Sequence, residues 1–333
     1  MPFSTQNRLL YTVAQVLLWL FAAQAQEDAA GSSLWQPADS LNKKRLCIAG
    51  GAGLVCYGAA TTALHFAWYR EYERSRFHTF SDWGHWAHMD KWGHLFANYA
   101  YSYMAFGAAR WTGMRRGAAL LTAAGCSMLL QTTVELMDGF SARWGYSWPD
   151  MAFNLAGTAL FAGQEWLWRE QRIRVKVSNH LPAYDARPVF ARNRATSSSA
   201  ADRARELYGR SLPERLLKDY NGTTIWFSVN PAAFRRGRAL LPWLNLAFGL
   251  GAGNLYGARN NRWEAPDGAQ YSLQHSHPRY RQFYLSLDVD LRRIPTQSSF
   301  LRFLLGALNW IKIPAPALEY NTRGQWRFHP LFW

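Results

Sequence analysis

Apolar residues dominate four long segments of the chain and recur there with the period of an α-helix. The segments run over residues 46–68, 90–111, 117–137 and 150–168. Apolar positions three and four residues apart form one face of a helix, and small residues, dense in all four segments, let helices pack closely. The pattern predicts four packed helices, of which the first is long enough to span a bilayer.

Polar side chains interrupt three of these segments. Each set falls on one face of its helix because its members are three, four or seven residues apart. The sets are Asp90 and His94, then Gln131, Glu135 and Asp138, and finally Asp150, Asn154 and Gly157. Ionisable groups inside an apolar bundle cost free energy unless they pair. They are therefore the candidate functional groups.

The periodicity changes after the fourth segment. Residues 176–215 are rich in Arg, Pro and Ser, which predicts a basic surface linker with a short helix near 201–208. Beyond the linker, apolar and polar residues alternate with the period of a strand. Strands are expected at 225–229, 244–250, 283–291 and 324–333, with a short amphipathic helix over 300–311.

The fold class expected from this pattern is mainly α, a four-helix membrane-type bundle followed by a small antiparallel β region. Four short strands are too few to close a transmembrane barrel, which needs about eight. Asp288 and Asp290 share one face of the clearest strand, and we expect that face to point to solvent. The expected divisions are a signal peptide at 1–25, a polar lead at 26–44, the bundle at 45–175, the linker at 176–215 and an α+β region with short antiparallel strands at 216–333.

The first 25 residues have the organisation of a secretory signal peptide. Arg8 supplies the positive charge, residues 9–21 form the apolar core, and Ala23-Gln24-Ala25 precedes a cleavage site. An uncleaved anchor is the alternative, although the core is short for a span. No cysteine follows the core, so acylation of a mature N-terminal cysteine is not expected.

Charge and aromatic content point to membrane lipids as a partner, with other envelope proteins as further candidates. The net charge is +15, and the chain contains 17 Trp and 16 Tyr. Anionic head groups attract basic surfaces, and amphipathic rings favour the membrane–water boundary. No nucleic-acid-binding motif is present, so nucleic acid is not an expected partner. Three cysteines cannot form a disulfide framework.

The positions of the arginines favour one membrane over the other. If the first helix enters from outside, Arg110, Arg115 and Arg116 remain outside, against the bias of inner-membrane proteins. We therefore expect an exported, periplasm-facing, membrane-associated protein of the cell envelope, at the outer rather than the inner membrane.

The polar motifs, in their order along the chain, resemble the YfiM-like family, whose members are called predicted periplasmic lipoproteins and carry a domain of unknown function. The motifs are Asp90-Lys-Trp-Gly-His94, Glu135-Leu-Met-Asp-Gly-Phe-Ser141, Trp144-Gly-Tyr-Ser-Trp-Pro-Asp150, Asn154-Leu-Ala-Gly157 and Gly163-Gln-Glu165. A weaker resemblance, to VanZ-like membrane proteins, rests on the Asp-Lys-x-x-His and Asp-x-x-x-Asn-x-x-Gly motifs. Both resemblances imply a small helical membrane-type bundle, and neither implies a reaction.

An up-down bundle would bring the end of its third helix beside the starts of the second and fourth. The polar residues are therefore expected to converge there as a candidate cluster of Asp90, His94, Glu135, Asp138, Asp150 and Asn154. Such a cluster is able to bind a divalent metal or to move protons, and the candidate metal ligands are His94, Glu135 and Asp150. The alternative is a hydrogen-bonded network that fixes helix packing, with aspartates as helix caps.

No motif of an established enzyme class accompanies the cluster. We therefore expect an envelope-associated protein with a structural or interaction role and no cofactor. The alternative is a membrane-embedded, metal-dependent hydrolase or transferase that acts on a lipid or lipid-linked substrate.

Overall fold

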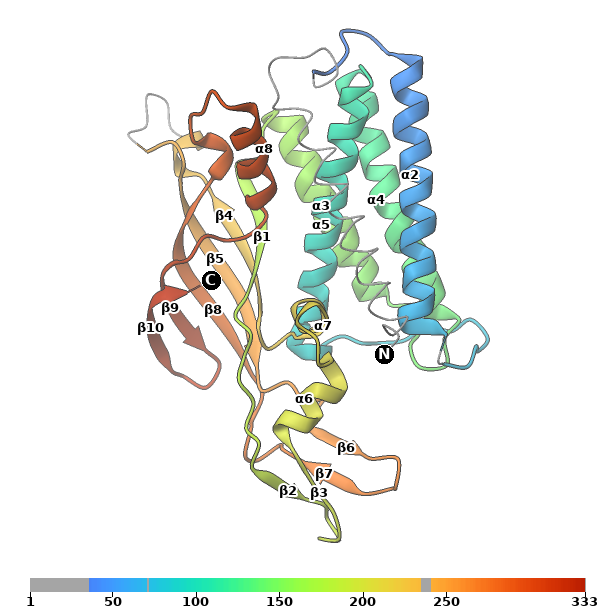
Figure 1. Ribbon diagram of the computed structural model, residues 1–333, viewed down its shortest axis with the longest axis vertical. Helices are drawn as coiled ribbons and strands as arrows, with labels where there is room; N and C mark the ends of the chain where they lie inside the picture. The colour runs from blue at the N-terminus through green and yellow to red at the C-terminus, as the bar shows by residue number, and fades with distance from the viewer. Residues whose placement is uncertain (1–35, 71, 235–240, 333) are drawn as a thin grey trace. The chain divides into compact units, whose positions relative to one another are not determined.

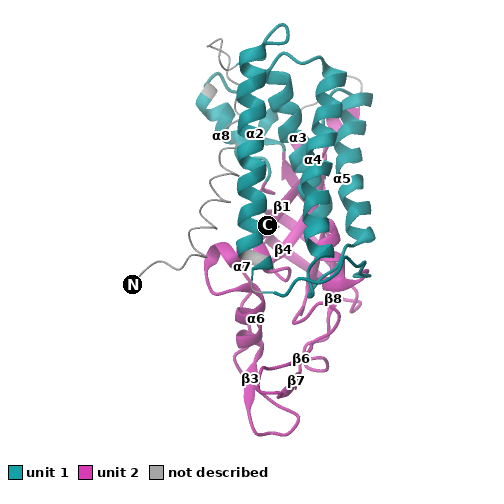
Figure 2. Ribbon diagram, turned by 90° about the vertical axis from the view of Figure 1, so that its right-hand side faces the viewer, with its two compact units in different colours: residues 1–82, 94–172, 290–310 teal, residues 83–93, 173–289, 311–333 magenta. Residues whose placement is uncertain are grey.

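The computed structural model describes residues 36–70, 72–234 and 241–332. The expected signal peptide at 1–25 lies outside the described residues. The chain divides into two compact units, coloured separately in Figure 2. The first comprises residues 1–82, 94–172 and 290–310, and the second comprises residues 83–93, 173–289 and 311–333.

Four long helices lie close to the positions that the apolar periodicity predicts. They are α2 (Lys43–Leu64), α3 (Met89–Trp111), α4 (Arg116–Gly139) and α5 (Trp148–Leu167), labelled in Figure 1. The first unit also contains α8 (Ser299–Leu308), close to the predicted amphipathic helix. The boundary between the units cuts α3 between Gly93 and His94. Short helical turns lie at His65–Tyr69, His85–His88, Pro231–Phe234 and Leu291–Arg293.

Two of the described helices, α2 and α4, are long and apolar enough to cross a membrane. They differ in burial. Only Ala63 is buried in α2, whereas α4 packs against α5 and buries a stripe at four-residue spacing. The stripe is Ala119, Ala123, Ser127, Gln131, Glu135 and Gly139. The buried stripe gives α4 one packed side, whereas the rest of that helix is half-buried or exposed.

The second unit is built on a six-stranded antiparallel sheet with the strand order β1-β4-β5-β8-β9-β10 (Figure 1). The strands are β1 (Ile173–Asn179), β4 (Thr223–Val229), β5 (Leu244–Gly253), β8 (Tyr280–Val289), β9 (Ala315–Asn321) and β10 (Trp326–Phe332). The unit also contains α6 (Ala200–Tyr208), α7 (Leu212–Lys218) and two small hairpins. These are β2 (Pro188–Phe190) with β3 (Ser197–Ser199), and β6 (Arg262–Glu264) with β7 (Gln270–Ser272).

The expected fold class, mainly α with a small β region, is therefore wrong. The described chain is a mixed α/β protein with a substantial sheet, and residues 176–215, expected as a linker, contain strands and helices of the second unit. The pattern missed β1 and β9 because their inward positions hold charged residues, Lys176 in β1 and Glu319 in β9. Both side chains are nevertheless buried.

One face of the sheet is buried, and it is largely polar. Its apolar part is a cluster with one residue from each of β4, β5, β8, β9 and β10, namely Trp226, Ala247, Tyr284, Ala317 and Phe332. The expectation that Asp288 and Asp290 face solvent is also wrong, because each is 1% exposed. Alternation located the strands correctly, but it did not reveal which face is covered.

Candidate functional site

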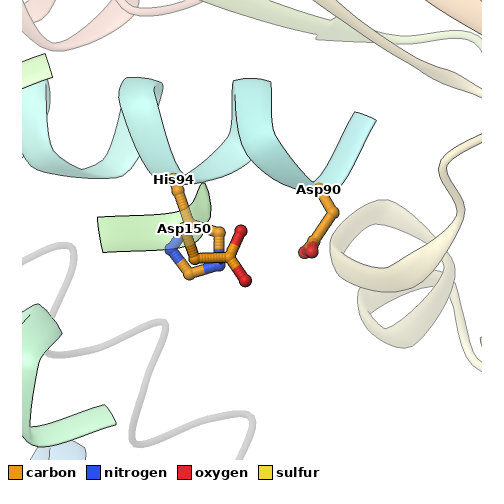
Figure 3. Close-up of side chains that lie close together, drawn as sticks. All are labelled: Asp90, His94 and Asp150. Carbon is orange, nitrogen blue, oxygen red and sulfur yellow. The ribbon is translucent and has the colours of Figure 1, made fainter. Parts of the chain in front are cut away.

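In the first unit, His94 of α3 lies between side chains of α4 and α5. Its Nδ1 is 3.8 Å from Oε1 of Glu135, and its Nε2 is 3.6 Å from Oδ1 of Asp150. Asn154 Oδ1 is within hydrogen-bond distance of Nδ1, at 3.1 Å. Figure 3 draws His94 on α3 and Asp150 on α5. The structure thus gathers four of the candidate residues, which we call the His94 cluster: His94, Glu135, Asp150 and Asn154.

Ser147 connects the start of α5 to its surroundings. As the N-cap residue its hydroxyl accepts a hydrogen bond from the backbone N–H of Asp150 at 3.1 Å. The same hydroxyl donates to Asp82 at 2.6 Å, and the Ser147 backbone N–H donates to Oε2 of Glu135 at 3.2 Å. Asp150 is therefore not the cap residue. Sequence analysis did not single out Ser147 or Asp82, although a serine three residues before an acidic residue at a helix start is a capping signal.

Gly157 sets the separation of α5 and α3. A Cβ atom there would lie 2.2 Å from the carbonyl oxygen of Leu95 and 3.0 Å from the backbone nitrogen of Tyr99. Only a residue without a side chain permits this approach of the two backbones. Because Gly157 follows Asn154 by three residues on the same helix, the close approach also brings Asn154 within reach of His94.

Burial dominates the electrostatics of the cluster. Glu135 is 1% exposed, and burial raises the pKa of its carboxyl to about 8, although His94 lowers it. Asp150 adds to the rise, because a nearby negative charge disfavours ionisation. Oε1 of Glu135 accepts no hydrogen bond from the residues that the structure describes. Glu135 is therefore expected to be largely protonated at neutral pH.

This elevated pKa predicts a pH-dependent stability. The folded state holds the Glu135 proton up to about pH 8, whereas the unfolded chain releases it near the ordinary value of 4.5. The protonated Glu135 therefore contributes its full stabilisation below the pKa that this carboxyl has in the unfolded chain. That contribution is lost as the pH rises through the pKa that the carboxyl has in the folded protein. We expect the free energy of unfolding, measured by denaturant titration, to fall as the pH is raised from about 5 to about 9.

Glu135→Gln removes the titrating group and is expected to flatten this decline. The matched control is Glu206→Gln on α6, because the Glu206 side chain is 60% exposed. The control should retain the wild-type slope. An unchanged slope in Glu135→Gln would show that this carboxyl does not titrate between the folded and unfolded states.

The two other candidate residues also have partners outside the four residues of the His94 cluster. Asp138, at the end of α4, accepts a hydrogen bond from the hydroxyl of Tyr69 at 2.7 Å. Asp90 belongs to the second unit, where it contacts Lys91 at 3.0 Å and the hydroxyl of Tyr220 at 3.2 Å. Asp90 lies one turn before His94 on α3 (Figure 3).

The cluster offers donors that suit a divalent metal, an imidazole and carboxylates. Glu135 and Asp150 approach different ring nitrogens, so an ion on either nitrogen would meet only one of these two carboxylates there. With Nδ1 beside Asn154 and Glu135, the remaining donors are Nε2 and Asp150. Asn154 and Glu135 would then orient the ring, as outer partners of a metal-binding histidine do.

Comparison with known proteins bears on this helical part of the chain. Residues 80–163 match the model of a family described as predicted periplasmic lipoprotein (DUF2279). The match confirms the resemblance to a periplasmic lipoprotein-like family of unknown function over those residues, and it supports an exported protein of the periplasmic envelope. No curated protein and no solved structure matches the chain. The resemblance to VanZ-like proteins stays a prediction.

Proposed function

We propose that the chain is an envelope protein with a structural or interaction role, and that the His94 cluster fixes the packing of α3, α4 and α5. The observation that carries the proposal is the way its polar groups bond to one another and to backbone. Glu135 accepts from the Ser147 N–H, Ser147 caps α5, and His94 meets Asn154. Hydrogen bonds between buried groups of three helices favour one arrangement of those helices, although one carboxylate oxygen each of Glu135 and Asp150 accepts no hydrogen bond from the described residues.

The alternative is a metal-dependent hydrolase or transferase that acts on a lipid or lipid-linked substrate. One observation favours it. The His94 side chain keeps 17% of its surface exposed, so an ion or a substrate atom has access to a ring flanked by two carboxylates. Proton transfer would suit Glu135, whose raised pKa lies close to neutral.

His94→Gln separates the two functions. If the cluster is structural, the variant loses about 1–3 kcal/mol of unfolding free energy, as expected for buried hydrogen bonds, and no metal. His275→Gln is the matched control, because His275 is exposed in the second unit. Its unfolding free energy should stay near that of the wild type.

Metal analysis of the same proteins completes the test. Stoichiometric zinc, manganese or magnesium in the wild type, absent from a folded His94→Gln variant, would overturn the structural role and favour the hydrolase or transferase. Equal, substoichiometric metal in both proteins, with a destabilised variant, supports the structural role.

For location, we propose that the protein faces the periplasm at the outer membrane. The arginines Arg110, Arg115 and Arg116 beside the helix ends support this choice over the inner membrane. Separation of inner from outer membrane by density, followed by detection of the protein in each fraction, tests it. Recovery with the inner membrane would contradict it.

A further inference from the structure

The sheet of the second unit has its polarity reversed relative to a sheet in a water-soluble protein. Such a sheet packs its apolar face on the core and exposes polar side chains. In β8 the buried polar residues are Gln282, Ser286 and Asp288, whereas the exposed residues between them are Phe283, Leu285 and Leu287. The strands β5 and β9 repeat the reversal, with Asn245 and Glu319 buried and Phe248 and Leu318 exposed.

Bonds between the buried polar side chains stabilise the arrangement in which the polar face of the sheet is buried. Nζ of Lys176 lies 2.7 Å from Oδ2 of Asp288, and both side chains are fully buried. The hydroxyl of Ser228 donates to the same carboxylate at 2.6 Å, while Gln282 donates to Glu319 at 3.1 Å. A slip of one residue would exchange the two faces and break these bonds. The outward direction of the apolar residues is therefore a fixed feature of the sheet.

Strand pairing aligns the exposed apolar residues into continuous rows. Phe248 pairs with Leu285, Leu285 with Leu318, and Leu318 with Phe328, across four strands. A second row follows the register through Leu250, Phe283, Tyr320 and Trp326. We call the exposed members of these rows, together with Leu287, the outer apolar face: Phe248, Phe283, Leu285, Leu287, Leu318, Tyr320, Trp326 and Phe328.

Eight large apolar side chains are exposed side by side on this face. Its exposed fractions run from 38% at Tyr320 to 67% at Phe328. Soluble monomers rarely expose contiguous apolar patches of more than a few hundred Å². Sheets in contact with lipid have this arrangement, with apolar side chains outward and polar ones inward.

Basic and aromatic residues gather at one end of the face. Arg281 and Arg323 are exposed, Arg281 lies on the same side of β8 as Phe283, and the Arg323 guanidinium lies 5.8 Å from the ring centre of Tyr280. The Thr322 backbone N–H donates to the Arg281 carbonyl, and the Arg281 backbone N–H donates to the Thr322 hydroxyl, so the β9–β10 turn lies beside the start of β8. Arginines attract anionic head groups, and Tyr and Trp favour the membrane–water boundary.

We propose that the outer apolar face docks on a lipid bilayer with anionic head groups, with its arginine-bearing end at the head-group level. The reversed polarity of the sheet and the charge of its end both favour lipid over a second copy of the chain. The proposal deepens the envelope role by naming a surface, and it rests on that role only for the presence of a membrane. Its test leaves the His94 cluster unchanged, so either proposal is able to fail alone.

The test measures the depth of single labelled positions in the full chain. Cys47, Cys56 and Cys126 are replaced by serine, and an environment-sensitive fluorophore is attached at Leu285→Cys. The matched control is Glu264→Cys, an exposed strand position in β6 of the same unit. Both proteins are reconstituted into vesicles of phosphatidylcholine and phosphatidylglycerol in equal parts, with a quencher attached to the lipid chains.

We expect strong quenching and a blue-shifted emission at Leu285, and neither at Glu264. The double variant Arg281→Glu/Arg323→Glu should weaken the quenching at Leu285, because the head groups no longer attract that end. Equal quenching at Leu285 and Glu264 would overturn the proposal. So would an emission at Leu285 that shifts to the blue with protein concentration in vesicle-free detergent, because a second copy would then cover the face.

Discussion

Asp288→Asn is expected to lower the free energy of unfolding by about 3–5 kcal/mol, the largest effect of any single substitution considered for this chain. The Asp288 carboxylate meets the ammonium group of Lys176 at 2.7 Å, and both side chains have no exposed surface. Its other oxygen accepts a hydrogen bond from the backbone N–H of Ile313 at 3.1 Å. Asparagine keeps the shape and removes the charge, so Lys176 remains buried as an uncompensated cation. Denaturant titration followed by circular dichroism measures the loss.

A double variant and an exposed pair serve as controls. Lys176→Met/Asp288→Leu removes both charges and should recover a large part of the lost stability, because the cost arises from the unpaired cation. Arg205→Gln breaks an ion pair with Asp202 whose side chains are more than half exposed, and it should change stability by less than about 1 kcal/mol. If Asp288→Asn loses as little stability as Arg205→Gln, the Lys176 side chain does not remain a buried, uncompensated cation in the folded variant.

Gly157→Ala is expected to destabilise the first unit by about 1–3 kcal/mol. The added Cβ would lie 2.2 Å from the carbonyl oxygen of Leu95, and that oxygen belongs to the backbone of α3. A backbone atom cannot rotate away as a flexible side chain does, so α5 must move from α3. The move would also draw Asn154 away from His94. Thermal and denaturant unfolding measure the loss.

Gly163→Ala is the matched control on the same helix. No atom lies within 4 Å of a Cβ at Gly163, so alanine should stabilise α5 by up to about 1 kcal/mol through its higher helix propensity. The two substitutions are therefore expected to have opposite signs. A stabilised Gly157→Ala variant would show that α3 and α5 are further apart than the structure places them.

The candidate site was partly visible in the sequence. Helical spacing predicted that polar residues on three helices would converge, and the structure gathers His94, Glu135, Asp150 and Asn154. The spacing of residues in the sequence predicts which side chains share one face of a helix, but it does not predict the distances between side chains on different helices. It therefore did not predict that Asp138 bonds to Tyr69, or that Asp90 contacts Lys91 and the hydroxyl of Tyr220.

By itself the sequence determined the positions of the long helices and of four strands, because the periods of 3.6 and 2 are local properties of the backbone. Only the tertiary structure decided which face of each strand is covered. Alternation in β8 is the same whether Asp288 or Leu287 points inward, and the choice depends on Lys176 of β1, more than a hundred residues away in the chain. Contacts between residues so distant in the chain determine that the polar face of the sheet is buried and that its apolar face is exposed.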